Sequence, residues 1–233
     1  MLKQIFEKIT GAKILRNAMP RGAFMENDVN NLSNGPLHEV WDIGAHQGET
    51  SLKFRKYFPK ALLRSFEPIR DNFEKLEYNC RHTKRQESYQ IALGEKSANL
   101  KINLRANSVL NSLKRNLNRP KPDDLGVETI EVVTIDEFIR SKDIQVVDLI
   151  KMDVEGFEHE VLQGAHESLI SGKVNFIYLE TGLDDRFVSF ESLIERLQKY
   201  SILPYGIYEQ SPHWTGIQKL WYWNALFVKE ELL

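Results

Sequence analysis

Trp41-Asp-Ile-Gly-Ala-His-Gln-Gly48 is the most informative part of this chain for its fold. It follows a polar segment that contains Gly and Pro, and it precedes a helical pattern that begins near Glu49. Glycine permits a sharp turn and a close approach of the backbone to a ligand. The free N-terminal amides of the helix then point back at the same turn. The stretch therefore predicts a strand, a tight turn and a helix around a nucleotide-like ligand.

Two kinds of nucleotide cofactor compete for this turn. A dinucleotide-binding turn has the pattern G-x-G-x-x-G, whose second glycine lets the backbone touch a pyrophosphate. Here that position is His46, whose ring would obstruct the approach, and Gly44 and Gly48 give the spacing G-x-x-x-G. The carboxylate of Asp42 repels a pyrophosphate but suits the amine-bearing tail of S-adenosylmethionine. A plain tight turn without a ligand is the alternative that the motif alone leaves open.

A second strand-like run, residues 61–67, ends in an acid. Pro68 follows it and prevents the strand from continuing. Glu67 lies roughly 20 residues beyond the turn, where an acid reaches ribose hydroxyls in a doubly wound fold. A carboxylate accepts charge-assisted hydrogen bonds from both hydroxyls, and such bonds are strong. A solvated glutamate at a strand end is the alternative, and the spacing favours the ligand role.

A third run, residues 146–156, is mostly apolar and ends in two acids and a glycine before another helical pattern. Ligands of open α/β sheets bind outside the carboxyl ends of the strands. Asp42, Glu67 and Asp153 each lie at such an end. We therefore expect the three acids to converge on one crevice.

At these residues the chain resembles the FkbM family of S-adenosylmethionine-dependent methyltransferases. The resemblance covers residues 19–228, and the Lys-Met-Asp-Val-Glu-Gly run of residues 151–156 is its most specific part. The family commonly has Asn where this chain has His46. The matching segments are 42–48, 66–68, 92–94, 134–136, 150–156 with Glu158, 179–180 and 224–228.

The resemblance implies an α/β fold of the Rossmann-like class I methyltransferase type, with a seven-stranded, mostly parallel sheet flanked by helices and an antiparallel strand near one edge. The alternation of strand and helix patterns independently favours a parallel sheet. Strands are expected at 38–43, 61–67, 88–93, 146–153, 174–180, 203–209 and 220–228, and helices at 49–58, 69–81, 157–171 and 190–200. Two further alternating runs, 99–104 and 128–133, flank a basic segment in which we expect substrate choice to lie.

The turn and the strand ends supply the expected cofactor-binding residues, which are Asp42, Gly44, Ala45, His46, Gly48, Glu67, Pro68, Ala92 and Asp153. A hydroxyl acceptor benefits from a general base that removes its proton. The candidates for catalysis are Asp153, Glu155, His159 and Glu180. Asp153 is the best placed, and Glu180 is expected to hold a substrate hydroxyl. Which acid takes the proton stays open.

A metal-assisted route is less favoured. Asp153, Glu155, Glu158 and His159 are of the ligand types that metals use, but their consecutive positions point in different directions. We expect no obligatory metal.

The expected function is O-methylation of a hydroxyl on a sugar or secondary metabolite, with S-adenosylmethionine as cofactor and a small-molecule or glycan acceptor. A non-catalytic S-adenosylmethionine-binding module is the alternative, and the intact acids argue against it.

The composition agrees with one globular enzyme domain. A chain of 233 residues with 42% hydrophobic and 27% charged residues is long enough for a substantial core. The net charge of −2 gives no strong electrostatic case for nucleic acid. The single cysteine, Cys80, excludes an intramolecular disulfide. No apolar run is long enough for a transmembrane segment and no signal-peptide core is present, so a cytoplasmic protein is expected.

The chain divides by pattern into residues 1–36, an N-terminal helix and the segment leading into the domain, and residues 37–233, the methyltransferase domain. Residues 1–16 carry an apolar stripe at helical spacing. Docking on the domain or on a second subunit, as in a homodimer, is favoured over a membrane-surface anchor.

Overall fold

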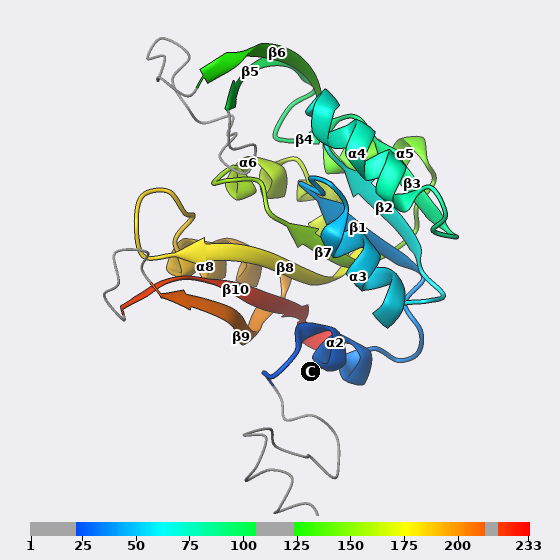
Figure 1. Ribbon diagram of the computed structural model, residues 1–233. Coiled ribbons are helices and arrows are strands. Elements are labelled where there is room, and N and C mark those ends of the chain that lie inside the picture. The colour runs from blue at the N-terminus through cyan, green and yellow to red at the C-terminus, as the bar shows by residue number, and fades with distance from the viewer. Residues whose placement is uncertain (1–21, 106–123, 213–218) are drawn as a thin grey trace, which may run out of the picture.

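The computed structural model describes residues 22–105, 124–212 and 219–233 (Figure 1). The strands are β1 (Glu39–Ile43), β2 (Leu62–Phe66), β3 (Gln86–Tyr89), β4 (Ala92–Leu93), β5 (Ala98–Arg105), β6 (Asp124–Val133), β7 (Val147–Met152), β8 (Val174–Gly182), β9 (Ile202–Pro212) and β10 (Leu220–Lys229). The α-helices are α2 (Met25–Leu32), α3 (Glu49–Tyr57), α4 (Arg70–Cys80), α5 (Ile135–Ser141), α6 (Glu158–Gln163), α7 (His166–Ile170) and α8 (Phe190–Leu197). Short 3₁₀ helices follow at Gln198–Tyr200 and Glu230–Leu232.

The main sheet has seven strands in the order β3-β2-β1-β7-β8-β10-β9. Its first five strands are parallel, and β10 runs antiparallel to both β8 and β9. The predicted seven-stranded sheet with one antiparallel strand near an edge is therefore confirmed. Because β1 lies between β2 and β7, the glycine turn that follows β1 lies between the carboxyl ends of these two neighbours.

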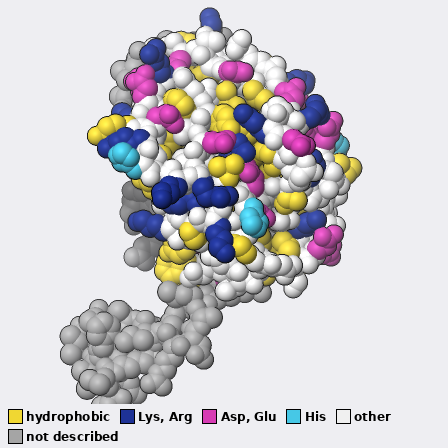
Figure 2. Space-filling view, turned by 90° about the vertical axis from the view of Figure 1, so that its right-hand side faces the viewer, with side chains coloured by type: hydrophobic (Ala, Val, Ile, Leu, Met, Phe, Trp, Pro, Cys, Tyr) yellow, Lys and Arg dark blue, Asp and Glu magenta, His cyan; other side chains and the backbone are white. Residues whose placement is uncertain are grey.

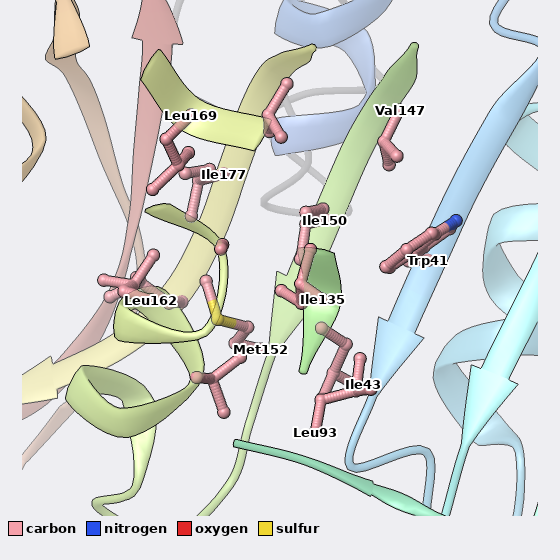
Figure 3. Close-up of a cluster of buried hydrophobic side chains, with 14 of the residues drawn as sticks. Trp41, Ile43, Leu93, Ile135, Val147, Ile150, Met152, Leu162, Leu169 and Ile177 are labelled. Atoms are coloured by element: carbon pink, nitrogen blue, oxygen red, sulfur yellow. The ribbon is translucent and has the colours of Figure 1, made fainter. Parts of the chain in front are cut away.

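Helices cover both faces of the main sheet. On one face, α5 to α8 pack against residues such as Trp41, Ile150 and Ile177 (Figure 3). On the other face, Val40 and Leu149 pack with residues of α2 and α3. Neighbouring strand residues thus point to opposite faces, as the two-residue period of a strand requires. Both faces are apolar because helices bury both of them, so the strands read as continuous hydrophobic runs.

Two predicted elements are each divided in the structure. The predicted strand 88–93 is wrong as a single strand, because β3 belongs to the main sheet and β4 to a separate sheet. The predicted helix 157–171 is two helices that separate at Gly164. A Cβ atom on Gly164 would lie 2.0 Å from the carbonyl oxygen of Gly94, so the glycine lets these two segments meet. Both breaks depend on tertiary contacts that the local sequence pattern does not contain.

The small sheet has the order β4-β6-β5, with β5 and β6 antiparallel. It contains the predicted half-exposed strands 99–104 and 128–133, and it lies at the end of the molecule opposite α2 (Figure 1). Residues 106–123, most of the basic segment between these strands, lie outside the described residues. Ile102 of β5 packs with Ile69 and Ala92, so this sheet is joined to the edge of the main domain by an apolar cluster.

Helix α2, which falls within the segment 1–36, packs directly on the main sheet. Met25 and Val29 are buried in the same cluster as Phe54 of α3. The carboxylate of Asp28 accepts a hydrogen bond from the Tyr208 hydroxyl of β9 at 2.7 Å. Residues 25–32 are therefore part of the domain's core. The predicted amphipathic helix of residues 1–16 lies outside the described residues.

The surface mixes charges of both signs. On the face in Figure 2, basic and acidic side chains are interspersed with hydrophobic ones. Within the described ranges, no helix has both the length and the apolar character that a membrane crossing requires.

Candidate active site

A cavity of about 290 Å³ lies at the carboxyl ends of β1, β2 and β7. The glycine turn, the start of α3, residues 66–69, residues 91–93 and residues 151–155 line it, and Ile102 of the small sheet completes the wall. Most of these side chains are apolar, and a few polar groups converge among them. This is the composition expected of a small-molecule site.

Gly44 shapes the turn after β1. Its φ is +75°, and a Cβ atom there would lie 1.9 Å from the backbone oxygen of Asp153. The amides of Gly44 and Ala45 both donate to the carbonyl oxygen of Phe66 at 3.0 Å. The turn is therefore fastened to β2 on one side and pressed against the end of β7 on the other. Only glycine fits both the dihedral angle and the space.

Glu67 is buried and faces the cavity from the end of β2. One carboxylate oxygen accepts a hydrogen bond from the amide of His46, and the other accepts one from the amide of Ile69, both at 3.0 Å. His46 itself has a φ of 49°, in the left-handed region. Burial raises the pKa of Glu67 to about 7, although these hydrogen bonds oppose the rise. The carboxylate is thus fixed in place and ready to accept further hydrogen bonds.

Asp42 does not line the cavity. It is buried beneath the turn, where its carboxylate lies 3.1 Å from Lys151 Nζ and accepts a hydrogen bond of 2.7 Å from Ser51 Oγ. Lys151 Nζ also lies 3.6 Å from a carboxylate oxygen of Asp153 and donates to the Gly44 carbonyl at 3.4 Å. Asp42 therefore contacts the cavity only indirectly. It holds the Lys151 ammonium group, which in turn links the ends of β1 and β7.

Gly48 also lies outside the cavity. Its φ is +92°, and a Cβ atom there would lie 2.9 Å from Leu76 and 3.0 Å from Cys80 Sγ, both on α4. Gly48 thus permits the close approach of α4 to the start of α3. The other predicted cofactor residues, Gly44, Ala45, His46, Glu67, Pro68, Ala92 and Asp153, all line the cavity.

Three carboxylates gather beyond β7 and β8. Asp153 and Glu155 line the cavity, and Asp153 is about half exposed. The β7–β8 register pairs Lys151 with Tyr178, so two residues further along, Asp153 and Glu180 lie on the same face of the sheet. Burial, together with the negative charges of Asp153 and Glu155, raises the pKa of Glu180 to about 8. Glu180 therefore changes its protonation state near neutral pH, where an ordinary glutamate is fully ionised.

His159 is placed apart from these acids. It lies on α6, and its Nε2 is 2.6 Å from the Ser192 hydroxyl of α8. It does not line the cavity. The turn between β7 and α6 is held by Glu158, whose Oε1 accepts hydrogen bonds from the amides of Val154 and Gly156. His159 is thus held by a residue of α8 and is not among the residues that line the cavity.

Several residues that line the cavity were not predicted as site residues, among them Lys151 and Asn72, whose side chains contact predicted ones. Lys151 lies inside a buried strand, and Asn72, on the first turns of α4, lines the cavity with its amide 3.5 Å from Glu67. A lysine within an apolar run signals a buried charge that needs a partner. No comparable signal marks Asn72. Among the described residues, no group of three or more His, Cys, Asp or Glu side chains is arranged to hold a metal ion.

Comparison with known proteins identifies the family. Residues 42–201 match the methyltransferase FkbM domain, and they include the glycine turn, Glu67, Asp153 and Glu180. The chain belongs to the FkbM methyltransferase family. Members of this family use S-adenosylmethionine.

Two relatives of this FkbM protein have curated functions. The 2-O-methyltransferase NoeI of Sinorhizobium fredii is 26% identical over 152 residues, which are 60% of this chain and 62% of NoeI. The hexuronic acid methyltransferase AglP of Haloferax volcanii is 29% identical over 154 residues, which are 64% of this chain and 59% of AglP. The chain thus spans about three fifths of the length of each relative.

Solved structures agree on the fold. The methyltransferase domain of METTL16 superposes with a TM-score of 0.52 at 12% identity, covering 97% of this chain and 77% of that one. The N-terminal domain of EvdMO1, solved with S-adenosylhomocysteine bound, gives 0.50 at 10% identity, covering 91% and 82%. The FkbM protein therefore has the Rossmann-like fold of class I methyltransferases.

Proposed function

We propose that this FkbM protein transfers a methyl group from S-adenosylmethionine to an oxygen atom of a sugar. One observation carries the proposal. Glu67 on one side of the Gly44 turn and Asp153 with Glu155 on the other side line a single cavity. A buried carboxylate suits the ribose hydroxyls of this cofactor, and the more exposed acids suit the amino group of its methionine part.

The residues of the cavity fit S-adenosylmethionine. Glu67 would accept hydrogen bonds from the ribose hydroxyls, since two amides already fix its position. Ile69, Ala92 and Ile102 form an apolar cluster that also lines the cavity, and they suit the adenine ring. Asp153 would receive the amino group of the methionine part. When bound, the cofactor supplies an activated methyl group.

The protein's own part in the reaction is to position the acceptor and to take its proton. Glu180 is the proposed general base, because its raised pKa lies near the pH at which an enzyme works and a base of this strength is effective there. The oxygen–methyl bond would form as the sulfonium–methyl bond breaks, which leaves S-adenosylhomocysteine, and the proton of the acceptor hydroxyl would pass to the Glu180 carboxylate. This differs from the expectation that favoured Asp153, whose side chain lies 3.6 Å from Lys151.

The relatives support a sugar as the acceptor. NoeI is a 2-O-methyltransferase, and AglP acts on a hexuronic acid. At 26% and 29% identity they favour the class of acceptor rather than a particular sugar. The acceptor is therefore proposed as a sugar ring, neutral or carboxylated.

Calorimetry with S-adenosylmethionine and S-adenosylhomocysteine tests the cofactor site. Both ligands are expected to bind, and Glu67→Ala is expected to weaken binding about 100-fold, because two charge-assisted hydrogen bonds are lost. Glu77→Gln, which changes an exposed carboxyl on α4, is the matched control and should bind like the wild type. Folded wild-type protein that binds neither ligand, or that binds NADH tightly, would contradict the proposal.

The affinity for S-adenosylhomocysteine should also depend on pH. Because burial raises the pKa of Glu67 to about 7, the empty site holds a proton below that pH. Ribose hydroxyls bind the ionised carboxylate, so this proton must leave on binding. The dissociation constant should rise as the pH falls through 7, by up to about tenfold per unit. Calorimetry in two buffers of different ionisation enthalpy should detect the released proton, and an affinity that stays constant would exclude this role of Glu67.

A further inference from the structure

A cluster of aromatic side chains lies beyond the carboxyl end of β8. The rings of Phe187 and Tyr222 are stacked, with centroids 5.4 Å apart and an interplanar angle of 24°. The ring of Trp221 meets both of them edge-on, 5.2 Å from Tyr222 and 6.1 Å from Phe187. All three side chains are partly exposed. They form an aromatic surface at the edge of the sheet where ligands bind, and we call these three residues the aromatic platform.

The backbone of β8 makes room for this platform. A Cβ atom on Gly182 would lie 2.4 Å from the ring of Phe187, so the ring lies directly against the strand where a side chain is missing. Tyr222 of β10 is the partner of Gly182 in the antiparallel pairing. Residues that face each other in such a pair point to the same face of the sheet. Phe187 and Tyr222 are thus held on one face of β8.

Glu180 lies on that same face. It precedes Gly182 by two residues, and side chains two residues apart share a face at a spacing of about 7 Å along the strand. The aromatic platform is therefore next to the proposed general base, on the side away from Tyr178. A ring bound on the platform would lie within reach of Glu180.

Two charged residues border the platform. Asp184 accepts hydrogen bonds from Trp221 Nε1 at 2.8 Å and from Arg186 Nε at 3.0 Å. The Arg186 guanidinium lies 4.5 Å from the centre of the Trp221 ring. The Arg186 side chain also keeps the pKa of Asp184 low, at about 2, so this carboxylate stays ionised. Asp184 and Arg186 thus place a hydrogen-bond acceptor and a hydrogen-bond donor, both held in position, beside the aromatic rings.

We propose that Phe187, Trp221 and Tyr222, bordered by Asp184 and Arg186, form the acceptor subsite and bind one sugar ring with a hydroxyl directed at Glu180. A pyranose has an apolar C–H face that packs on aromatic rings and a rim of hydroxyls that hydrogen-bond charged side chains. The arrangement of rings and charges matches both features. This inference rests on the proposed function, since it assigns the acceptor of that reaction.

Saturation-transfer NMR tests the subsite without turnover. The probes are methyl β-glucopyranoside and methyl β-glucopyranosiduronate, each added to protein that contains S-adenosylhomocysteine. Ring C–H protons of at least one probe are expected to receive saturation from the wild type. Tyr222→Leu and Phe187→Leu should weaken binding about tenfold, whereas Tyr222→Phe keeps the ring and should retain it. Tyr78→Leu removes an exposed ring on α4 that also packs against an arginine, and it serves as the matched control.

The outcomes separate this proposal from the cofactor proposal. Binding of S-adenosylhomocysteine is measured on the same samples, and its absence would overturn the proposed function. Wild-type protein that binds S-adenosylhomocysteine but contacts neither sugar would overturn the subsite alone. Equal sugar binding by the wild type, Tyr222→Leu and Phe187→Leu would overturn it as well. Loss of sugar binding in both leucine variants, with retention in Tyr222→Phe and Tyr78→Leu, is the result expected.

Discussion

Replacing Glu180 by glutamine is expected to lower kcat by about 10²- to 10⁴-fold, the usual contribution of a positioned general base. Glutamine has almost the same shape but cannot take a proton from the acceptor hydroxyl. Because Glu180 does not line the cofactor cavity, the dissociation constant of S-adenosylmethionine should remain that of the wild type. Steady-state kinetics with a sugar acceptor and calorimetry with the cofactor measure the two quantities separately.

The pH profile sharpens this test. In the wild type, kcat should rise as the pH increases toward about 8, because the Glu180 carboxyl must lose its proton before it can act as a base. A bound cation nearby would shift this limb to lower pH. Glu180→Gln should lose the limb, and Glu167→Gln, which alters an exposed carboxyl on α7, should keep it. An unchanged kcat in Glu180→Gln would exclude the proton-transfer role and would favour an acceptor carboxylate, which has no proton to remove.

Glu180→Gln, which is expected to lower kcat, should raise the free energy of unfolding. The pKa of Glu180 rises from 4.5 to about 8 on folding, so between these values the folded protein binds more protons than the unfolded chain. Stability from this group therefore falls as the pH rises through that window. Glutamine does not titrate, and Glu180→Gln should thus gain stability relative to the wild type from acid to mildly alkaline pH. Urea unfolding at several pH values checks the sign and needs no acceptor.

Lys151→Met is the second large effect expected, a loss of about 3–5 kcal/mol in the free energy of unfolding. Methionine fills a similar volume but leaves the buried Asp42 carboxylate without the ammonium group that lies 3.1 Å away. The variant also removes the link from Lys151 to Asp153 and to the Gly44 carbonyl. Weaker binding of S-adenosylmethionine should accompany the loss of stability. Urea unfolding followed by circular dichroism measures the first effect and calorimetry the second.

A double variant separates these two consequences. In Asp42→Asn with Lys151→Met, two neutral side chains replace the buried ion pair, and most of the lost stability should return. Cofactor affinity should stay low, because Asp153 and the turn have still lost their common partner. Lys173→Met, which alters a half-buried lysine at the opposite end of the sheet, is the control. A Lys151→Met protein as stable as the wild type would show that the pair with Asp42 contributes little.

Much of the fold could be predicted from local patterns. The alternation of strand and helix patterns predicted a parallel sheet, and the resemblance to the FkbM family implied seven strands with one antiparallel. The division of residues 88–93 between β3 and β4, and of residues 157–171 between α6 and α7, could not be predicted in this way. The contact between Gly94 and Gly164 is formed by segments far apart in the chain.

The candidate site shows the same division. Gly44, Glu67 and Asp153 were marked by their spacing and by their positions at strand ends, and all three line the cavity. Asp42 also lies near the end of a strand, yet its side chain is buried and pairs with Lys151. A strand-end position indicates the edge of the sheet that a residue occupies. It does not indicate whether a neighbouring strand supplies an opposite charge that draws the side chain inward.

Sequence patterns were sufficient to predict the class of fold, the glycine turn and the strand-end acids, because these depend on the backbone freedom of glycine and on the periodicity of strands and helices. The folded arrangement sets which acid is paired with a lysine, which acid has a raised pKa and which aromatic rings lie beside that acid. Asp42 is buried and pairs with Lys151. Burial and nearby acids raise the pKa of Glu180. The ring of Phe187 packs against Gly182, where there is no side chain. Each of these properties is set by groups that are distant in sequence, and charge and burial act through space.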